Sequence, residues 1–459
     1  MEAIIPRCAG LDVHNKEVQA NIRILDMHTG QLTCNEVRSF STMTCGLKEL
    51  AAWLFEQGVT HVAMESTGVF WKPVFNVLDG RFEVLLCNAQ HIKNVPGRKT
   101  DVKDCQWICQ LNQHGLLKGS YVPSTPQREL RDLTRHRVEL LEDRTRVVNR
   151  LHKILQDANI KLSAVASDVL GASGRAMIQA LIAGQNDPRQ LTMLAKGKLK
   201  RKHAALVQAL EGNVSEHHRH MLRVHWAQLE MLERLIREQE QQITAQMKSQ
   251  RLNAQALAQQ ALATNNEKAP EATTEPEKVP EEPAKKKVVP APYTFPQAIE
   301  AISKVTGIAE DSAQGILAEI GTEMAQFPGT REIASWTGIC PGNRQSAKKR
   351  GSGKTTKGNH WLRRVLTQCA WATTRKKDSY FRAQFKRLVG RRGKKRALLA
   401  VGHSLLVTIY HILKYHTEYV DLGFDYFDRL HDDRRLRKHI KALEALGYTL
   451  IAPPAKAAS

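Results

Sequence analysis

The sequence has no long uninterrupted apolar run and no secretory leader pattern. Its longest apolar stretch, ALLAVGHSLLVTIYHIL, includes His403 and His411 and is shorter than a bilayer span requires. The opening residues, MEAIIPRCAG, lack the charged and then apolar order of a signal peptide. We therefore expect neither a membrane partner nor secretion, and we expect the apolar stretch to form a buried helix.

Disulfide, zinc and nucleotide-binding patterns are also missing. The 8 cysteines are scattered along 459 residues, which is typical of reduced thiols in a cytosol. Cys105 and Cys109 stand close together on a predicted helix, but no second pair accompanies them, so a metal site there is not indicated. The segment GSGK (351–354) lacks the GxxxxGK(S/T) spacing after a strand, which argues against nucleotide hydrolysis.

Acidic residues are few relative to basic ones. The chain has 68 Lys and Arg against 46 Asp and Glu, a formal charge of +22 and a pI near 9.7. The excess is concentrated in residues 343–364, which hold no acid, and in residues 375–396, which hold only Asp378. One such run is as easily a solvated face or a tail, but two runs separated by the apolar LRRVLTQCAWA indicate a folded basic surface. Such a surface favours a nucleic-acid partner.

The first part of the chain alternates between strand and helix patterns, and its order resembles an RNase H-like sheet. Three strands follow one another and two more are separated by helices. The predicted strands cover residues 7–14, 18–25, 35–41, 60–66 and 82–88, and the predicted helices lie near 46–57, 69–78 and 100–114.

Four acids occupy informative places in this pattern. Asp12 lies within the first predicted strand, Glu65 ends the fourth, and Asp101 and Asp104 share a face of the following helix. In an RNase H-like sheet, acids at such places converge. We therefore predict a two-metal carboxylate site of the kind that supports phosphoryl transfer.

Apolar residues recur every seven positions in the middle of the chain, first at Leu133, Leu140, Val147 and Ile154, and later at Leu222, Leu229, Ile236 and Ile243. These are coiled-coil seams, which either pack within one chain as a bundle or join protomers. We favour an oligomer, a dimer or a tetramer. Residues 253–292 are rich in Ala, Pro, Glu and Lys and have no aromatic residue before Tyr293, so we expect a flexible tether there.

Two features mark the C-terminal part. The segment AISKVTGIAEDSAQGILAEIG resembles a helix-hairpin-helix, whose turn offers N–H groups to a phosphate, although a packed helical pair explains it equally well. The cationic segment NRQSAKKRGSGKTTKGNHWLRR contains Ser346 and Ser352. Nearby lysines could counter the charge that develops when a serine hydroxyl attacks phosphorus. Composition alone does not separate the two serines.

Together these motifs resemble the DEDD-type insertion-sequence transposases related to the pilin-gene invertase. The resemblance rests on GLDVH, AMESTG and KTDVKD near the start, and on VTGIAEDSAQGILAEIG and GICPGNRQSAKKRGSGKTTKGNHWLRRVL near the end. It implies a RuvC-like catalytic domain joined to a C-terminal transposase domain that carries a serine. The expected domains are residues 1–125 (catalytic), 126–252 (coiled coil), 253–292 (tether) and 293–459 (C-terminal, mainly α).

The resemblance also implies the chemistry. The family moves its own DNA element through a covalent serine–DNA intermediate, and some members are guided by a structured RNA. By position, Asp12, Glu65, Asp101 and Asp104 become ligands of Mg²⁺ (or Mn²⁺), and Ser346, here in the sequence SAKK, becomes the nucleophile. The expected nucleic-acid contacts are Arg344, Lys348, Lys349, Arg350, Lys354, Lys357, Arg363 and Arg364. The expected location is a prokaryotic cytosol, at the nucleoid.

Two other classes remain open on the sequence. A RuvC-type nuclease or junction resolvase would use the same acids with water as nucleophile and would not need the serine domain. A catalytically silent nucleic-acid-binding protein would retain the basic surface alone. The presence of all four acids argues against the silent protein.

Overall fold

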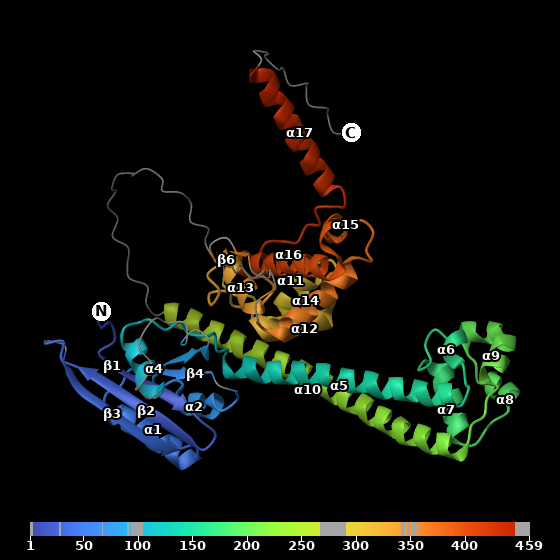
Figure 1. Cartoon of the computed structure of the whole chain (residues 1–459), viewed down its shortest axis with the longest axis horizontal. Helices are drawn as coiled ribbons and strands as arrows, with labels where there is room; N and C mark the ends of the chain where they lie inside the picture. Colours follow the sequence, from blue (N-terminus) through green and yellow to red (C-terminus); the bar gives the residue numbers. More distant parts are fainter. Residues whose placement is uncertain are drawn as a thin grey trace. The chain divides into compact units, whose positions relative to one another are not determined.

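The computed structural model describes residues 3–26, 29–66, 68–89, 92, 104–266, 291–340, 345–346, 349–350, 355 and 358–445. The chain divides into two compact units, Met1–Pro123 and Ser124–Ser459. Figure 1 labels most helices and strands of the two units.

The first unit contains a mixed five-stranded sheet. Its strands are β1 (Arg7–Val13), β2 (Glu17–Leu25), β3 (Leu32–Ser41), β4 (His61–Glu65) and β5 (Glu83–Cys87). They lie in the order β3-β2-β1-β4-β5, with the first three antiparallel and with β4 and β5 parallel to β1. The predicted strands are confirmed within a few residues at each end, and this sheet is compatible with an RNase H-like domain.

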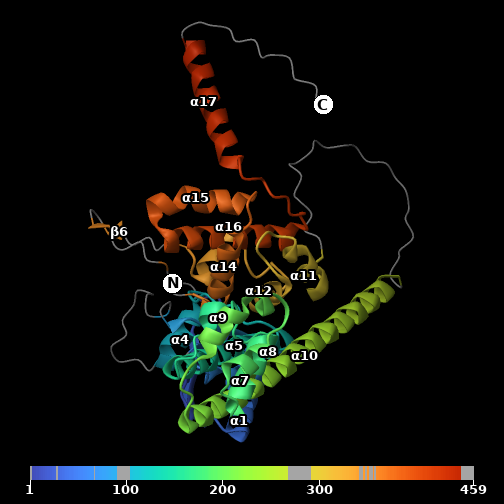
Figure 2. The same cartoon turned by 90° about the vertical axis from the view of Figure 1, so that its right-hand side faces the viewer.

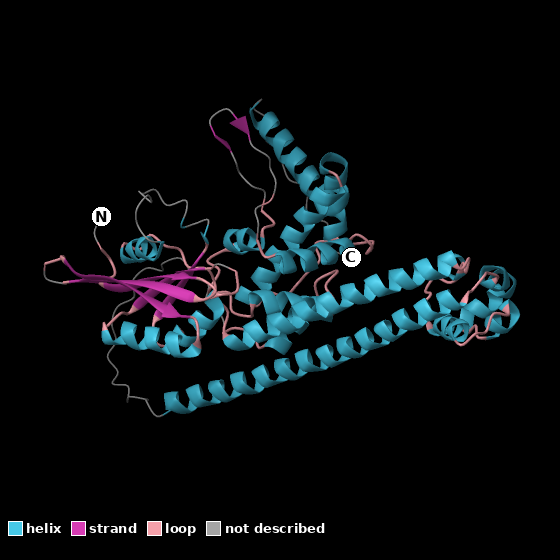
Figure 3. Ribbon diagram, turned by 60° about the horizontal axis from the view of Figure 1, so that its bottom comes forward, coloured by secondary structure: helices cyan, strands magenta, loops and turns pink. Residues whose placement is uncertain are grey.

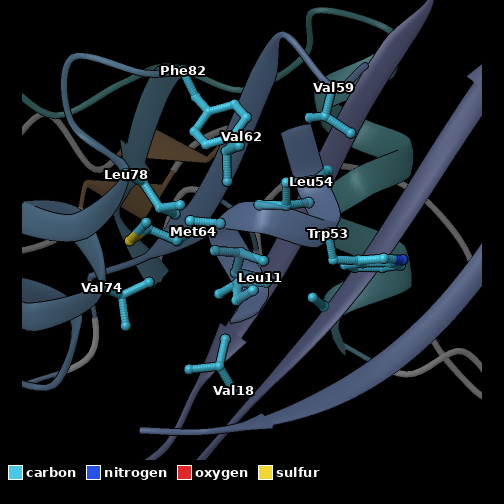
Figure 4. Packing of buried hydrophobic residues seen from close by; sticks show 14 of the residues in the cluster. Leu11, Val18, Trp53, Leu54, Val59, Val62, Met64, Val74, Leu78 and Phe82 are labelled. Carbon is cyan, nitrogen blue, oxygen red and sulfur yellow. The ribbon is translucent and has the colours of Figure 1, made fainter. Parts of the chain in front are cut away.

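Helices cover both faces of this sheet (Figure 3). Alternate β1 residues, including Leu11, turn to the face covered by α1 (Thr44–Glu56) and α2 (Trp71–Leu78), where they share a core with Met64 and Leu54 (Figure 4). The opposite face carries α4 (Asp104–Gln113), whose Trp107 and Ile108 pack on Ala63 of β4. Because side chains alternate along a strand, Cys8, Gly10 and Asp12 belong to the α4 face.

The helix α4 lies in backbone contact with β1 at Gly10. A Cβ atom at that position would stand 2.2 Å from the Cys109 nitrogen and 2.4 Å from the Cys105 oxygen. Asn112 on the next turn donates from Nδ2 to the Ala9 carbonyl at 3.3 Å. The absence of a side chain at residue 10 therefore sets how closely α4 approaches the strand.

The second unit is built on two long helices, α5 (Thr125–Asp157) and α10 (Glu216–Asn266). They run antiparallel, because Pro126 near the start of α5 contacts Gln246, whereas Arg144 further along α5 contacts the earlier Glu233. The predicted seams meet within the chain, where Val147, Leu151 and Leu155 share a core with Leu222 and Leu229. The seam of α5 thus packs against the seam of α10 in the same chain. The expected dimer or tetramer stays a prediction.

A group of short helices joins the far ends of α5 and α10 (Figure 1). These are α6 (Leu162–Val165), α7 (Ala172–Ile182), α8 (Pro188–Met193), the 3-10 helix η1 (Gly197–Lys202) and α9 (His203–Leu210). Their apolar faces complete the same core.

The helix α10 extends into the segment predicted as a tether. It continues to Asn266 because the stretch AQALAQQALA consists of Ala, Gln and Leu, all good helix formers. The rest of the predicted tether, through residue 290, lies outside the described residues.

The remaining helices are α11 (Phe295–Ser303), α12 (Glu310–Ile320), α13 (Thr330–Thr337), α14 (His360–Thr373), α15 (Tyr380–Arg392), α16 (Lys394–Tyr415) and α17 (Tyr426–Ala445). The turn between α11 and α12 packs on α14, since a Cβ at Gly307 would stand 2.5 Å from Thr373 Cγ2. Close packing against α14 is sufficient reason for a glycine at this turn. Phosphate binding at the turn stays a prediction.

The apolar helix α16 lies across α14 and beside α15 (Figure 2). By length and composition alone this helix could cross a membrane, but half of its most apolar 18-residue segment is buried inside the protein. Val401, Leu405 and Ile409 are fully buried along one side. The expected buried helix is confirmed.

The close approach at Gly10 generates a stability prediction. Gly10→Ala should lower the free energy of unfolding of the first unit by about 1–3 kcal/mol or more, since the added methyl group meets helix backbone that cannot move alone. Thermal and denaturant unfolding measure the loss. Gly390→Ala is the control, because it lies within α15 with no atom within 4 Å of the added Cβ, and it should be neutral or stabilising. Equal stability of Gly10→Ala and the unchanged protein would contradict the packing described.

Candidate active site

The strand register places Asp12 beside Glu65. Leu11 of β1 pairs with Met64 of β4 in parallel, and the two acids are the next residues along these strands. Both lie on the face that carries α4, two positions beyond Gly10 and Ala63 respectively. The carboxyl ends of neighbouring parallel strands are common ligand sites in α/β sheets.

Asp104 reaches the same place from α4. It is the first residue of that helix, and the following Cys105 lies directly over Gly10. An acid at a helix N-terminus is favoured by the helix dipole, typically by about 0.3–1 kcal/mol. The contact that holds α4 to β1 therefore also positions this third carboxylate.

The electrostatics of Asp12 show that the three acids share one neighbourhood. Partial burial raises the pKa of Asp12, and the negative charges of Asp104 and Glu65 raise that pKa further. His14 opposes the rise, with its Nε2 3.2 Å from Asp12 Oδ2. His14 was not among the site residues expected from the sequence, although its position within GLDVH, two residues after the acid, was a usable signal.

The donor set fits a hard divalent cation. Carboxylate oxygens are the ligands that Mg²⁺ and Mn²⁺ prefer. The positive charge of such an ion also reduces the electrostatic repulsion between neighbouring carboxylates. Within the described ranges, no three His, Cys, Asp or Glu side chains already stand together as a metal site. The fourth expected ligand, Asp101, lies outside those ranges.

Buried thiols lie beside the acids on the α4 face. Cys8 Sγ and Cys109 Sγ are 3.8 Å apart, and Cys105 is buried with them. Burial raises the pKa of Cys109 well above its usual value, and the hydrogen bond with Cys8 adds to the rise. A protonated thiol is a poor metal ligand, so this geometry gives no support to a soft-metal site at Cys105 and Cys109.

Ser346 lies in a short hairpin of the second unit. Its strand β6 (Gln345–Ser346) pairs antiparallel with β7 (Lys349–Arg350), and the backbone of Ser346 lies opposite that of Lys349. One expected cationic residue and the expected nucleophile thus occupy paired backbone positions of the hairpin. The other expected residues of this segment lie outside the described residues, namely Arg344, Lys348, Ser352, Lys354 and Lys357.

The two ends of the serine-bearing segment are held together. Gly338 ends α13 in the left-handed region, with φ 74°, and the chain returns at Gly358. A Cβ at Gly358 would stand 2.4 Å from the Gly338 nitrogen, and the Asn359 N–H donates to the Trp336 carbonyl at 3.1 Å. The two ends of the segment therefore meet at one place, which forms its base.

A buried glutamate anchors this base to α5. Glu319 of α12 is 2% exposed, and its two carboxylate oxygens accept from Arg135 Nε at 2.7 Å and Nη2 at 2.8 Å. The Asn359 amide also donates to Glu319, at 2.6 Å, while its oxygen caps the N-terminus of α14. One carboxylate thus connects α5, α12 and the start of α14.

Comparison with known families accounts for both units. A model of DEDD-type IS110 transposases matches residues 9–160, which include all four expected acids. A second model, described as the transposase IS116/IS110/IS902 family, matches residues 299–386, which include both serines. The chain belongs to the IS110 family of transposases. No curated protein matches it.

Membership of this family makes the protein a DNA-cleaving and rejoining enzyme of an insertion sequence. Its DNA partner follows from that activity, and DEDD-type transposase domains are typically metal-dependent.

The two described arginines of α14 differ in their surroundings in this transposase. Arg364 forms an ion pair with Glu142 of α5, so part of its charge is used within the protein. Arg363 is half-buried on the same helix. Of the two, Arg363 is the better candidate for a nucleic-acid contact, because it forms no salt bridge with an acid in the described part of the chain.

The charge pattern around Asp12 is tested by two substitutions with opposite effects. Glu65→Gln should lower the pKa of Asp12 by removing a nearby negative charge, whereas His14→Ala should raise it by removing a partner of the charged form. The carboxyl carbon shift of Asp12, followed against pH in metal-free buffer, measures both. Shifts in the same direction, or none, would contradict the arrangement.

The Glu319 anchor predicts a stability loss. Glu319→Gln should destabilise the second unit by about 2–3 kcal/mol, less than for a fully buried pair because Arg135 is 32% exposed. Glu300→Gln is the matched control, since Glu300 makes only a surface pair with Lys304 at 3.8 Å and should change stability little. Equal unfolding midpoints for the two variants would show that Glu319 is no anchor.

Proposed function

We propose that this transposase cuts and rejoins DNA with Mg²⁺ or Mn²⁺ at Asp12, Glu65, Asp101 and Asp104, and that Ser346 forms the covalent bond to DNA. The observation that carries the proposal is the grouping of three acids from separate elements. Asp12 and Glu65 follow the paired residues Leu11 and Met64 of β1 and β4, and Asp104 begins the helix whose Cys105 lies over Gly10. Such grouping is unfavourable without a cation, so it is expected mainly where function requires it.

When bound, the metal would polarise a phosphodiester and stabilise the oxygens that attack and leave. The side chains have the other tasks. Asp12 and Glu65 present oxygens from neighbouring strand ends, and Asp104 closes the group from α4. His14 Nε2 lies 3.2 Å from Asp12 Oδ2 and offsets part of the rise in the pKa of Asp12, which favours the charged form that ligates a cation.

The serine step conserves the energy of the phosphodiester. The Ser346 hydroxyl would attack phosphorus and lose its proton, a phosphorus–oxygen bond of the DNA would break, and one DNA end would leave with a free hydroxyl group. Attack by a hydroxyl of another DNA end on the same phosphorus would reverse the step and free the serine. Lys349, opposite Ser346 in the hairpin, supports the choice of this serine because it can counter charge on the phosphate.

The wider partners follow from the family resemblance and from the charge. We propose a structured guide RNA, an oligomer of two or four chains, and action at the nucleoid in a prokaryotic cytosol. The formal charge of +22 supports binding to polyanions without distinguishing DNA from RNA. The four-part division of the chain, with a tether between the coiled coil and the C-terminal domain, is part of the same proposal.

A metal-dependent nuclease with water as nucleophile is the second candidate. It is favoured by the compactness of the first unit, Met1–Pro123, which carries the expected acids without the serine-bearing segment.

The metal site is tested by Asp12→Asn, Glu65→Gln and Asp104→Asn. Each should abolish DNA cleavage and leave DNA affinity nearly unchanged, because each removes ligand charge without altering the Lys and Arg residues that bind phosphate. A gel assay of cleavage in Mg²⁺ and a binding assay in chelator measure the two effects. Asp79→Asn, outside the site, should cleave normally. Cleavage by Asp12→Asn near the unchanged rate would refute the assignment.

The nucleophile is tested by Ser346→Ala and Ser352→Ala. The unchanged protein and Ser352→Ala should form a DNA adduct that survives denaturation, and Ser346→Ala should form none. Gel migration and peptide mass identify the adduct. Loss of the adduct in Ser352→Ala alone would transfer the role to that serine. Cleavage without any adduct in the unchanged protein would establish the water-driven nuclease.

A further inference from the structure

A dense group of cations lies at the end of the α5–α10 pair, in and beside η1. Lys196, Lys198, Lys200, Arg201 and Lys202 are all exposed, and we call them the tip surface. The sequence has no acid between Asp187 and Glu211. This segment lies outside the two matched regions, residues 9–160 and 299–386.

The tip surface is carried by an ordered scaffold. Leu199, within η1, packs on the same core that buries Leu206 and Leu210 of α9. The Lys196 N–H donates to Ser173 Oγ at 2.8 Å, and the end of α9 is held where the Lys161 N–H donates to the Ala209 carbonyl at 2.7 Å. The charges are therefore presented from a fixed turn. Their side chains are exposed, and Lys202 Nζ also donates to the Val165 carbonyl at 3.0 Å.

These cations are not neutralised by the described part of the chain. No salt bridge within the described part of the chain involves a tip-surface residue, and two acids of the same helical group accept from backbone N–H groups instead. Asp187 accepts from the Arg189 N–H at the start of α8, and Asp168 accepts from the Leu170 N–H. Crowded like charges repel one another, so an ordered turn that keeps them unpaired is suited to an external polyanion.

The lack of aromatic residues around the tip surface indicates which kind of polyanion it suits. Residues 158–215 contain no Phe, Trp or Tyr. Single-stranded nucleic acids are held largely by stacking on aromatic rings. Membrane-surface helices insert Trp, Phe or Leu, whereas the leucines of this segment pack in or against the hydrophobic core. Contact with the phosphates of a duplex requires cations alone.

We propose that the tip surface binds the phosphate backbone of a nucleic-acid duplex, independently of sequence and apart from the catalytic acids. The duplex can be DNA or base-paired RNA, since both present the same phosphodiester chemistry. Such a contact would let the helical pair hold nucleic acid at a second place on the chain.

The test compares two triple variants of the full chain. Lys198→Gln/Lys200→Gln/Arg201→Gln removes three tip charges. Arg150→Gln/Lys153→Gln/Arg237→Gln removes three exposed charges from α5 and α10 and is the matched control. Affinity is measured in chelator, so that no cleavage occurs, for a DNA duplex, an RNA duplex, a single strand and anionic vesicles, over about 50–200 mM salt.

The tip variant should bind a duplex more weakly, and the slope of log affinity against log salt should fall by about two to three, the release expected for three phosphate contacts. The control should keep the full slope. Loss confined to DNA or to RNA identifies the source of the duplex. Equal slopes for the two variants, or loss seen only with single strands or vesicles, would overturn the proposal. Because the assay excludes cleavage, its failure would leave the proposed chemistry untouched.

Discussion

The backbone contact between α4 and β1 is the constraint on which the acidic site of this transposase depends. Residue 10 has no side chain, so the helix approaches until the Cys105 oxygen and the Cys109 nitrogen lie where a Cβ would be. That approach brings Asp104, at the start of the helix, to the end of β1 and β4. A larger residue at this point would move one carboxylate away from the other two.

The same contact has an electrostatic consequence. Asp12 is partly buried near two other carboxylates, which raises its pKa, and His14 offsets only part of this effect. A neutral Asp12 would be a poor metal ligand, whereas a divalent cation would favour the charged form of all three acids. Cation binding and ionisation are thus linked at this site, and the scaffold beneath it, rather than the site itself, must supply the stability.

Local patterns predicted much of this structure, and long-range contacts did not follow from them. The alternation around Leu11 and Met64 located β1 and β4, and the acids were evident at their ends. A seven-residue period at Val147 identified a seam, but it could not tell an intramolecular partner from another chain. Glu319, within ILAEIG, gave no signal of burial because its partner Arg135 is distant in sequence. The predicted tether was judged by its overall composition, so the run of helix-forming residues at its start, which extends α10 to Asn266, was not recognised.

We propose that Asp12, Glu65 and Asp104 jointly hold a divalent cation. Anomalous diffraction from crystals of the full chain grown with Mn²⁺ tests it most directly, because the ion is located without reference to activity. We expect a peak within about 2–2.3 Å of oxygens from these three side chains, the range for a bound hard cation. A structure with Mn²⁺ bound elsewhere, and with these three carboxylates turned away from one another, would show that they do not form a metal site.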